Sequence, residues 1–339
     1  MMQNVVSAYT LAFVILSAFT LMAFLLYLFR KKQLLTILPV VATLVTVFLL
    51  YRFIGNAAAP YYFDMMALDL CIALVSTILA IFYISKPYIF VGLIILLIAG
   101  FMIYLVNYSN QAIGTSTTFA AVFAIGTIYG LLYREFMLGP RRSEKAKKTK
   151  KVEINRDIVQ IILGIVLIGI ILFFSSDYIT VAGVIFAFIM LCYTFNNLLA
   201  NRNLSLLYKR AMDLERKDAT YGQGATYLAA STALIVGFNH NVHVLLFGIA
   251  VLFFADSMAT IVGVSMRRAA QLPYNRNKTI AGSVAFFIIA AIAGFVLIGS
   301  FLGPVFALVL AFVESLGTSI DDNIRSGVIV VVLSLLAGL

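Results

Sequence analysis

Residues 242–264 read VHVLLFGIAVLFFADSMATIVGV, an apolar run whose one acidic residue is Asp256 and which contains no lysine or arginine. A helix needs about 20 predominantly apolar residues to cross the hydrocarbon core of a bilayer, so this run is long enough to span a membrane. A charge at membrane depth costs roughly 2.5 kcal/mol or more, and such residues mostly face a polar cavity, a partner or an ion. The stretch therefore predicts a membrane-spanning helix and marks Asp256 as the first place to look for function.

The rest of the chain repeats this apolar pattern. Of its 339 residues, 63% are hydrophobic and 11% are charged, which is typical of membrane proteins and not of soluble ones. Twelve apolar stretches fit a membrane span: 5–29, 33–54, 65–85, 88–106, 117–133, 158–174, 179–200, 223–238, 242–264, 279–298, 303–318 and 324–339. The first ends in Arg30-Lys31-Lys32 without a cleavage site and is predicted to be an anchor. We expect an all-α, multi-pass integral membrane protein with about 12 transmembrane helices, in the cell membrane or its equivalent.

The positive charges predict the orientation of these spans. Residues 139–156 carry eight of the 24 lysines and arginines, and basic loops stay on the cytoplasmic side. Counting outward through twelve spans places every other lysine and arginine except Arg52 on that side, with both termini outside. The same cations could also attract anionic lipid headgroups. They lie between spans and not in a basic module with interleaved aromatic residues, so no nucleic-acid partner is expected.

The basic segment 139–156 is also the predicted linker, because it interrupts the apolar pattern for longest and combines proline, serine and lysines. It separates an N-terminal membrane region of about five helices, 1–138, from a core of about seven helices, 157–339. No sequence repeat relates the two parts, which argues against an inverted-repeat transporter. In the first part, Asp69 and Arg52 could pair across helix ends, or Asp69 could be a hydrated helix-end residue; a structural role is favoured for both.

Polar residues of the second part gather at the predicted cytoplasmic surface. They are Arg156-Asp157 with Gln160, Glu215-Arg216-Lys217-Asp218, Asp256, 276–279, Glu314 and Asp321-Asp322-Asn323. The opposite surface holds little beyond Asp177 and 239–243. This asymmetry is not explained by loops being polar in general, and it predicts a site at one face of the membrane.

Asp256 shares a helix stripe with Thr260 and Gly263, because these residues are spaced i, i+4 and i+7. Small residues on such a stripe usually indicate close packing of membrane helices. Asp256 can therefore be read as a packed hydrogen-bonding residue or as a ligand. The residues that follow it in the chain favour the second interpretation.

Two later clusters could bind phosphate and metal. Lys278 precedes an apolar helix whose first turn contains Thr279, Gly282 and Ser283, and a helix N-terminus with a lysine favours a phosphate. The alternative is a helix cap with a lysine that only sets topology. Glu314 lies in an apolar run and is followed by 321–323, and carboxylates of this kind suit magnesium. A solvated acidic turn would explain the aspartates better than it explains Glu314.

The residues of these clusters resemble the motifs of a known family. The residues concerned are Asp256-x-x-Ala259-x-x-x-Gly263, Lys278-Thr279-x-x-Gly282-Ser283, Glu314 and Asp322-Asn323. In order and spacing, residues 156–339 resemble the polyprenol kinases, which include dolichol kinase and phytol kinase and are related to the phosphatidate cytidylyltransferases. The resemblance implies CTP-dependent phosphorylation of a lipid alcohol with Mg²⁺ at the cytoplasmic face. The implied partners are a lipid alcohol, a nucleoside triphosphate and the surrounding membrane lipids.

The resemblance also implies roles for individual residues. It implies that the catalytic residues are Asp256, Lys278 and Glu314, and that magnesium is bound by Asp256, Glu314 and Asp322. It implies that the nucleotide is bound by Arg216, Gly263, Lys278, Thr279, Gly282 and Asn323. It implies that the substrate is positioned by Arg156, Asp157 and Gln160. Other readings are a cytidylyltransferase, which attacks the α-phosphate and makes a CDP-linked lipid, and a transporter or a catalytically divergent membrane scaffold.

The chain departs from the family pattern at two places that matter for mechanism. Members commonly have Gly-Asp where this chain has Ala255-Asp256, and Arg-Lys-x-x-His where it has Arg156-Asp157-x-x-Gln160. A glutamine can position a hydroxyl but cannot take its proton. Asp256 or Asp157 is therefore expected to act as the base, unless the activity has been lost or changed.

Overall fold

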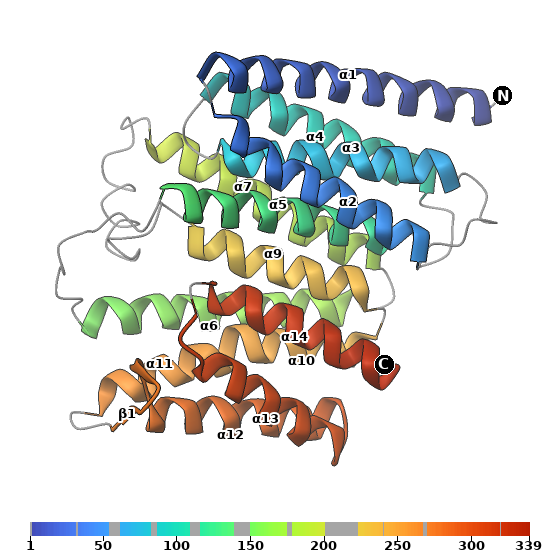
Figure 1. Ribbon diagram of the computed structural model, residues 1–339. Coiled ribbons are helices and arrows are strands. Elements are labelled where there is room, and N and C mark those ends of the chain that lie inside the picture. The colour runs from blue at the N-terminus through green and yellow to red at the C-terminus, as the bar shows by residue number, and fades with distance from the viewer. Residues whose placement is uncertain are drawn as a thin grey trace.

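The computed structural model describes residues 2–31, 33–53, 62–82, 87–108, 116–138, 150–174, 178–200, 223–239, 241–266, 270–318 and 320–339. Almost all of these residues are helical, and the helices lie roughly side by side (Figure 1). Seven described helices are long and apolar enough to cross a membrane, and shorter apolar helices accompany them. The predicted class, an all-α polytopic membrane protein, is confirmed.

The elements follow the apolar stretches in order. They are α1 (Met2–Lys31), η1 (Leu34–Ile37), α2 (Leu38–Phe53), α3 (Tyr62–Ile81), α4 (Pro87–Tyr108), α5 (Ser116–Leu138), α6 (Lys150–Phe173), α7 (Tyr178–Ala200), α9 (Gln223–Phe238), α10 (Val242–Ile249), the π-helical η2 (Ala250–Ala255), α11 (Asp256–Ser265), β1 (Gln271–Leu272), β2 (Asn275–Thr279), α12 (Ile280–Leu297), α13 (Leu302–Ser315) and α14 (Asp322–Ala337). The helix α6 begins at Lys150, so the last part of the segment assigned to the linker is helical. Residues 139–149 lie outside the described residues.

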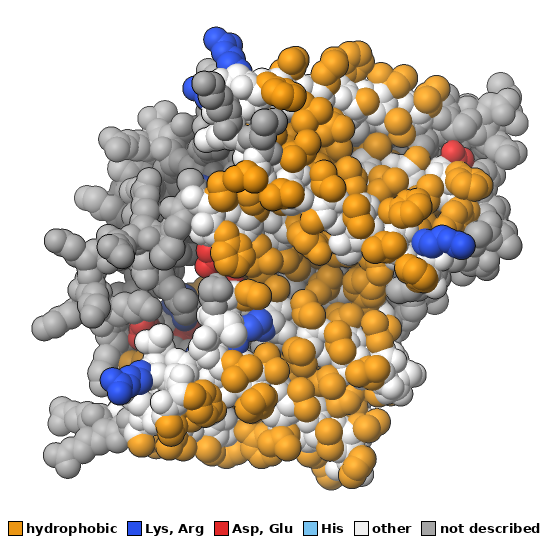
Figure 2. Space-filling model, viewed as in Figure 1, with side chains coloured by type: hydrophobic (Ala, Val, Ile, Leu, Met, Phe, Trp, Pro, Cys, Tyr) orange, Lys and Arg blue, Asp and Glu red, His pale blue; other side chains and the backbone are white. Residues whose placement is uncertain are grey.

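One small sheet interrupts the helical pattern. The strands β1 and β2 pair antiparallel, with Gln271 opposite Thr279 and Leu272 opposite Asn275. The hairpin that they form lies at one end of the bundle, whereas the start of α1 and the end of α14 lie at the other (Figure 1). Figure 2 shows one face of the molecule, where hydrophobic side chains cover most of the middle and charged side chains lie mainly toward the ends.

The helix α3 is the centre of the N-terminal part and contacts α1, α2, α4 and α5. Thr77 of α3 donates to Thr43 Oγ1 of α2 at 3.1 Å, and Thr46 Oγ1 of α2 lies 3.2 Å from Tyr129 Oη of α5. Asp69 is fully buried and accepts a hydrogen bond from the Tyr51 hydroxyl. Asp69 is therefore an internal structural residue and not a hydrated helix end.

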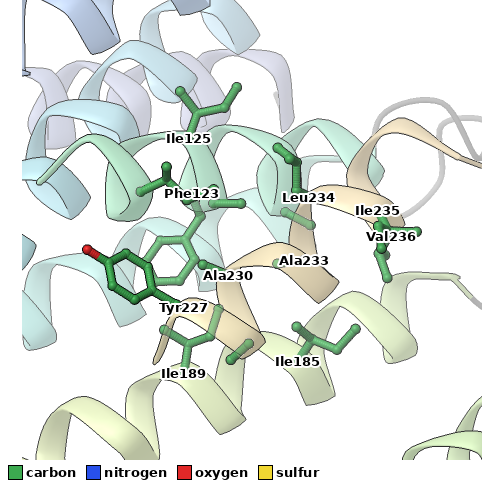
Figure 3. Close-up of a cluster of buried hydrophobic side chains, with 14 of the residues drawn as sticks. Phe123, Ile125, Ile185, Ile189, Tyr227, Ala230, Ala233, Leu234, Ile235 and Val236 are labelled. Atoms are coloured by element: carbon green, nitrogen blue, oxygen red, sulfur yellow. The ribbon is translucent and has the colours of Figure 1, made fainter. Parts of the chain in front are cut away.

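The helix α5 joins the two parts of the chain, because it packs against α3 on one side and α9 on the other. Figure 3 shows Phe123 of α5 and Ile189 of α7 gathered around the α9 residues Tyr227 and Ala230. A Cβ atom on Gly237 would lie only 2.5 Å from the backbone nitrogen of Ala121, so α5 and α9 approach closely there. The two predicted regions thus share a continuous hydrophobic core.

Candidate functional site

Four separate segments meet at the hairpin end of the bundle. Asp256 is the first residue of α11, Lys278 lies on β2, Glu314 is next to the last residue of α13, and Asp322 is the first residue of α14. The helix α12 packs against both α11 and α13 and so connects their positions. The structure brings together the four residues that the sequence marked as the centre of a site.

Lys278 links two of the carboxylates. Its ammonium group donates a hydrogen bond to Glu314 Oε1 and another, at 3.2 Å, to Asp322 Oδ2. The Glu314 side chain is only 1% exposed and that of Lys278 is 25% exposed. A buried carboxylate requires such a partner, because a charge left unpaired in the interior is strongly destabilising.

The ionisation of Lys278 follows from the same contacts. Burial by itself lowers the pKa of its ammonium group, but the carboxylates of Asp322, Glu314 and Asp256 raise it by more. The resulting pKa lies above the usual value for lysine. Lys278 is therefore positively charged throughout the physiological pH range.

Asp256 is half-buried and lies within electrostatic range of Asp322, Lys278, Glu314 and Arg156. It is the residue at which the π-helical segment η2 gives way to regular α-helix. Short π-helical segments within α-helices are frequent at functional sites. The side chain predicted from its membrane depth to be functional thus lies at an irregularity of its own helix and beside a cluster of charges.

Gln160, which was predicted to position a substrate, contacts the helix that carries Asp256. Its Nε2 group donates a 2.8 Å hydrogen bond to the Leu252 carbonyl in η2. This hydrogen bond ties α6 to the segment before Asp256. Gln160 thus supports the helix that carries Asp256, and its role in positioning a substrate stays a prediction.

Arg156 and Asp157, the other residues predicted to position substrate, bond to each other. Both Nε and Nη2 of Arg156 donate to Asp157 Oδ1, at 3.2 and 3.0 Å. Asp157 is buried, and its Oδ1 is held by the Arg156 guanidinium. Of the two aspartates considered as the base, the geometry favours Asp256.

The predicted nucleotide-binding glycines pack between helices. A Cβ atom on Gly282 would lie 2.7 Å from the Ala259 carbonyl oxygen, and one on Gly263 would lie 2.8 Å from Thr279 Oγ1. Thr279 Oγ1 in turn accepts a 3.1 Å hydrogen bond from the Gly282 backbone N–H and caps α12. These three residues therefore hold α11 against α12, and their contact with a nucleotide stays a prediction.

The two remaining predicted nucleotide residues differ in what the structure shows. The backbone N–H of Asn323 donates to Asp321 Oδ1 at 3.0 Å, which caps α14. Asn323 Oδ1 is buried and has no hydrogen-bond partner among the described residues, so it remains available to a ligand. Arg216 lies outside the described residues.

Sequence reasoning missed the residues that anchor the hairpin. Asn275 Nδ2 donates to the Ser315 carbonyl at 2.9 Å, and the Tyr274 hydroxyl lies 2.8 Å from Ser315 Oγ. Arg325 caps the end of α13 by donating to the carbonyls of Val313 and Leu316, at 2.7 and 3.0 Å. Asparagine in a short polar run could have indicated a turn. Its partners, however, lie about 40 residues later in the chain and left no signal in the local sequence.

The site offers oxygen ligands for a magnesium ion, although Lys278 lies between two of them. Within the described ranges, no group of three or more His, Cys, Asp or Glu side chains is arranged to hold a metal by itself. Magnesium is usually bound by one or two carboxylates together with substrate phosphates. Glu314 Oε2 is buried and has no hydrogen-bond partner in the described structure, so it can serve as such a ligand. The residues fit a metal that arrives with a nucleotide.

Comparisons with known proteins identify one similar protein and no function. No known family matches the chain, and no solved structure matches it. The chain is 28% identical to an uncharacterized protein of Methanocaldococcus jannaschii over 174 residues. That match covers 51% of this chain and 87% of the relative.

Proposed function

We propose that this protein phosphorylates a membrane lipid alcohol of the dolichol, polyprenol or phytol type and that CTP is the phosphoryl donor. The observation that carries the proposal is the contact of Lys278 with Glu314 and Asp322, beside Asp256. These residues come from four segments, and they are the ones on which the resemblance to polyprenol kinases rests.

The charge balance of the cluster supports a nucleotide that arrives with a metal. The carboxylates of Asp256, Glu314 and Asp322 surround the single ammonium group of Lys278. The cluster is therefore negatively charged when no metal ion is bound, and it then repels a triphosphate. Magnesium, when bound, would neutralise phosphate charge, and Asp256, Glu314 and Asp322 are the residues that would hold it. Lys278 is partly exposed and can turn from Asp322 toward a phosphate oxygen.

Phosphoryl transfer requires mainly alignment of the reactants and neutralisation of charge. In the proposed reaction the lipid hydroxyl oxygen forms a bond to the γ-phosphorus of CTP, and the bond from that phosphorus to the bridging oxygen breaks. The hydroxyl proton passes to Asp256, and CDP leaves. We place this end of the bundle at the cytoplasmic face, because the basic residues 150 and 151 begin α6 there.

The test is a transfer assay with purified protein in lipid nanodiscs, magnesium, and CTP labelled at either the α- or the γ-phosphate. The acceptors are polyprenols, phytol and diacylglycerol, and ATP replaces CTP in a parallel series. We expect the γ label, and not the α label, to enter a lipid alcohol. Transfer of the α label would instead establish a cytidylyltransferase. Absence of both transfers across the panel would contradict catalysis and favour a scaffold.

A further inference from the structure

An apolar crevice lies within the membrane-spanning part of the bundle, between α6, α7 and α9. Its volume is about 100 Å³. Leu163 and Val166 of α6 and Phe188 of α7 form its sides, and Ile185, Ala229 and Phe253 form its buried floor. The one hydroxyl in its lining, that of Thr232, donates to the Leu228 carbonyl at 2.9 Å and is satisfied within its own helix. The crevice therefore suits a hydrocarbon and not water.

The crevice opens sideways to the membrane. Although α6 and α7 follow each other in the chain, α6 packs mainly against α10, η2 and α11, while α7 packs against α9, α5 and α4. In the described part of both helices, contacts between α6 and α7 are few. Val166, at the mouth, is 53% exposed, so a lipid can reach the crevice without passing through water.

The crevice and the charged cluster follow each other along one face of α6. Arg156, Gln160, Leu163, Leu167 and Ile170 are spaced four, three, four and three residues apart, which places them on the same face of a helix. The polar members are near the site, and the apolar members line the crevice. Only about 4.5 Å of helix rise separates Gln160 from Leu163.

The floor of the crevice also leads to the site. Phe253 lies three residues before Asp256, on the η2 segment that Gln160 holds. A hydroxyl group beside Asp256 would therefore have its attached carbon chain directed along α6 and over Phe253.

We infer that this crevice binds the part of the hydrocarbon tail nearest the hydroxyl of the lipid alcohol, which enters laterally between α6 and α7. The inference rests on the proposed function for the identity of the headgroup. The crevice is smaller than the cavity of about 150 Å³ that accepts benzene in another protein, so it holds only a short stretch of chain. The enzyme should consequently be sensitive to bulk near the hydroxyl and tolerant of total tail length.

The first test detects binding without activity. Full-length protein in nanodiscs is photolysed with a farnesol analogue that carries a diazirine close to its hydroxyl, and the labelled peptides are mapped by mass spectrometry. We expect label within 163–170 and 184–188, displaced by unlabelled farnesol. Val166→Phe should reduce this labelling about tenfold, because the larger side chain overfills the apolar site.

Ile165→Phe is the matched control. Ile165 adjoins Val166 and is similarly exposed, at 58%, but does not line the crevice. Ala229→Leu fills the crevice from its floor and gives a second variant in case Val166→Phe does not fold. Label found only outside the crevice, or equal labelling in the crevice-filling variants and Ile165→Phe, would overturn the inference.

The second test separates the tail site from the proposed reaction. Val166→Phe should raise the KM for farnesol about tenfold and leave the KM for CTP unchanged, whereas Ile165→Phe should alter neither. Crevice labelling without any phosphate transfer would refute the proposed function and retain a lipid-binding crevice. Phosphate transfer that is unaffected by filling the crevice would retain the function and refute the tail site.

Discussion

At the residue scale, the contact of Lys278 with Glu314 and Asp322 bears on stability as well as on the proposed chemistry. Glu314 is nearly inaccessible, and its described partner is the Lys278 ammonium group. Removing the lysine leaves an uncompensated charge in the interior, whereas removing both charges leaves two neutral polar groups. Paired substitutions can therefore separate the structural role of the lysine from its proposed role toward phosphate.

Lys278→Met is expected to lower the free energy of unfolding by about 3–5 kcal/mol, the range for breaking a buried ion pair on one side. The double variant Lys278→Met with Glu314→Gln should recover much of this loss while remaining inactive. Thermal unfolding in detergent measures the difference. Equal unfolding temperatures for the single and double variants would show that Glu314 does not depend on the lysine.

The raised pKa of Lys278 also predicts how this stabilisation depends on pH. A lysine whose pKa is higher in the folded state than in the unfolded state stabilises the folded protein. This stabilisation is complete below the pKa of the unfolded state, about 10.4, and is lost as the pH rises through the pKa of the folded state. The difference in unfolding temperature between wild type and Lys278→Met should therefore be constant between about pH 6 and 9. A decline within that interval would indicate a lysine that is less firmly paired.

Asp256→Asn tests the proposed base. Asparagine preserves size and most hydrogen bonding but cannot accept the hydroxyl proton or attract magnesium by charge. Lipid phosphorylation should fall by about a hundredfold or more, the effect typical of removing a positioned acid or base, while expression and unfolding temperature stay near wild type. Near-normal activity would mean that Asp256 is a packed residue, and the mechanism would have to be withdrawn.

At the element scale, two contacts in neighbouring turns of α6 hold η2, and with it Asp256. Gln160 donates to the Leu252 carbonyl, and Gly164 lies so close to Phe253 that an added Cβ atom would be 2.7 Å from the Phe253 Cβ. The first contact fixes a polar group of the backbone, and the second allows the helices to approach. Displacing α6 should therefore disturb the position of Asp256 without touching it.

Gly164→Ala is expected to destabilise the protein by about 1–3 kcal/mol and to lower activity, because the added methyl group forces α6 away from Phe253. The control is Gly169→Ala on the same helix, where a Cβ atom would meet nothing within 4 Å and alanine favours the helix. Unfolding temperature and phosphate transfer are measured for both variants. Equal behaviour of the two would exclude the close contact at Gly164.

At the scale of the whole molecule, α5 couples the N-terminal part to the helices that carry the site. Its contact with α9 includes the close approach of Gly237 to Ala121 and a 2.9 Å hydrogen bond from the Tyr227 hydroxyl to Glu135 Oε2. The helix α9 in turn packs against α14, which begins with Asp322. The N-terminal helices thus support the site through packing, although the charges that form it come from later segments.

Gly237→Ala should weaken this coupling, because its methyl group would collide with the α5 backbone, which cannot rotate away as a side chain can. Gly224→Ala on the same helix has open space around it and serves as the control. The unfolding temperature is measured for both variants, and the chain is also divided within 139–149 so that the two fragments can be co-expressed. We expect Gly237→Ala, and not Gly224→Ala, to lower the unfolding temperature clearly and to weaken the association of the two fragments. If both glycine variants behaved like wild type, the α5–α9 contact would not be a close one.

Much of the architecture could be predicted from sequence, because a membrane span is defined by a local property. About 20 consecutive apolar residues suffice to predict a helix wherever they occur. Wherever the structure describes them, the predicted stretches accordingly coincide largely with helices or with the continuous run from α10 to α11. Charged groups inside such stretches are costly, so Asp256 and Glu314 could be recognised as exceptional without knowledge of their partners.

The sequence by itself determined the membrane class, the order of the helices and the identity of the exceptional charges. Only the tertiary structure decided which charges meet, that Lys278 lies on a strand, that Gly263 and Gly282 face helices, and that Asn275 bonds to Ser315. The physical reason is the range of the interactions. Hydrophobic partition acts on each stretch separately, whereas ion pairs, close glycine contacts and the crevice beside α6 require side chains that are distant in sequence to pack at one point.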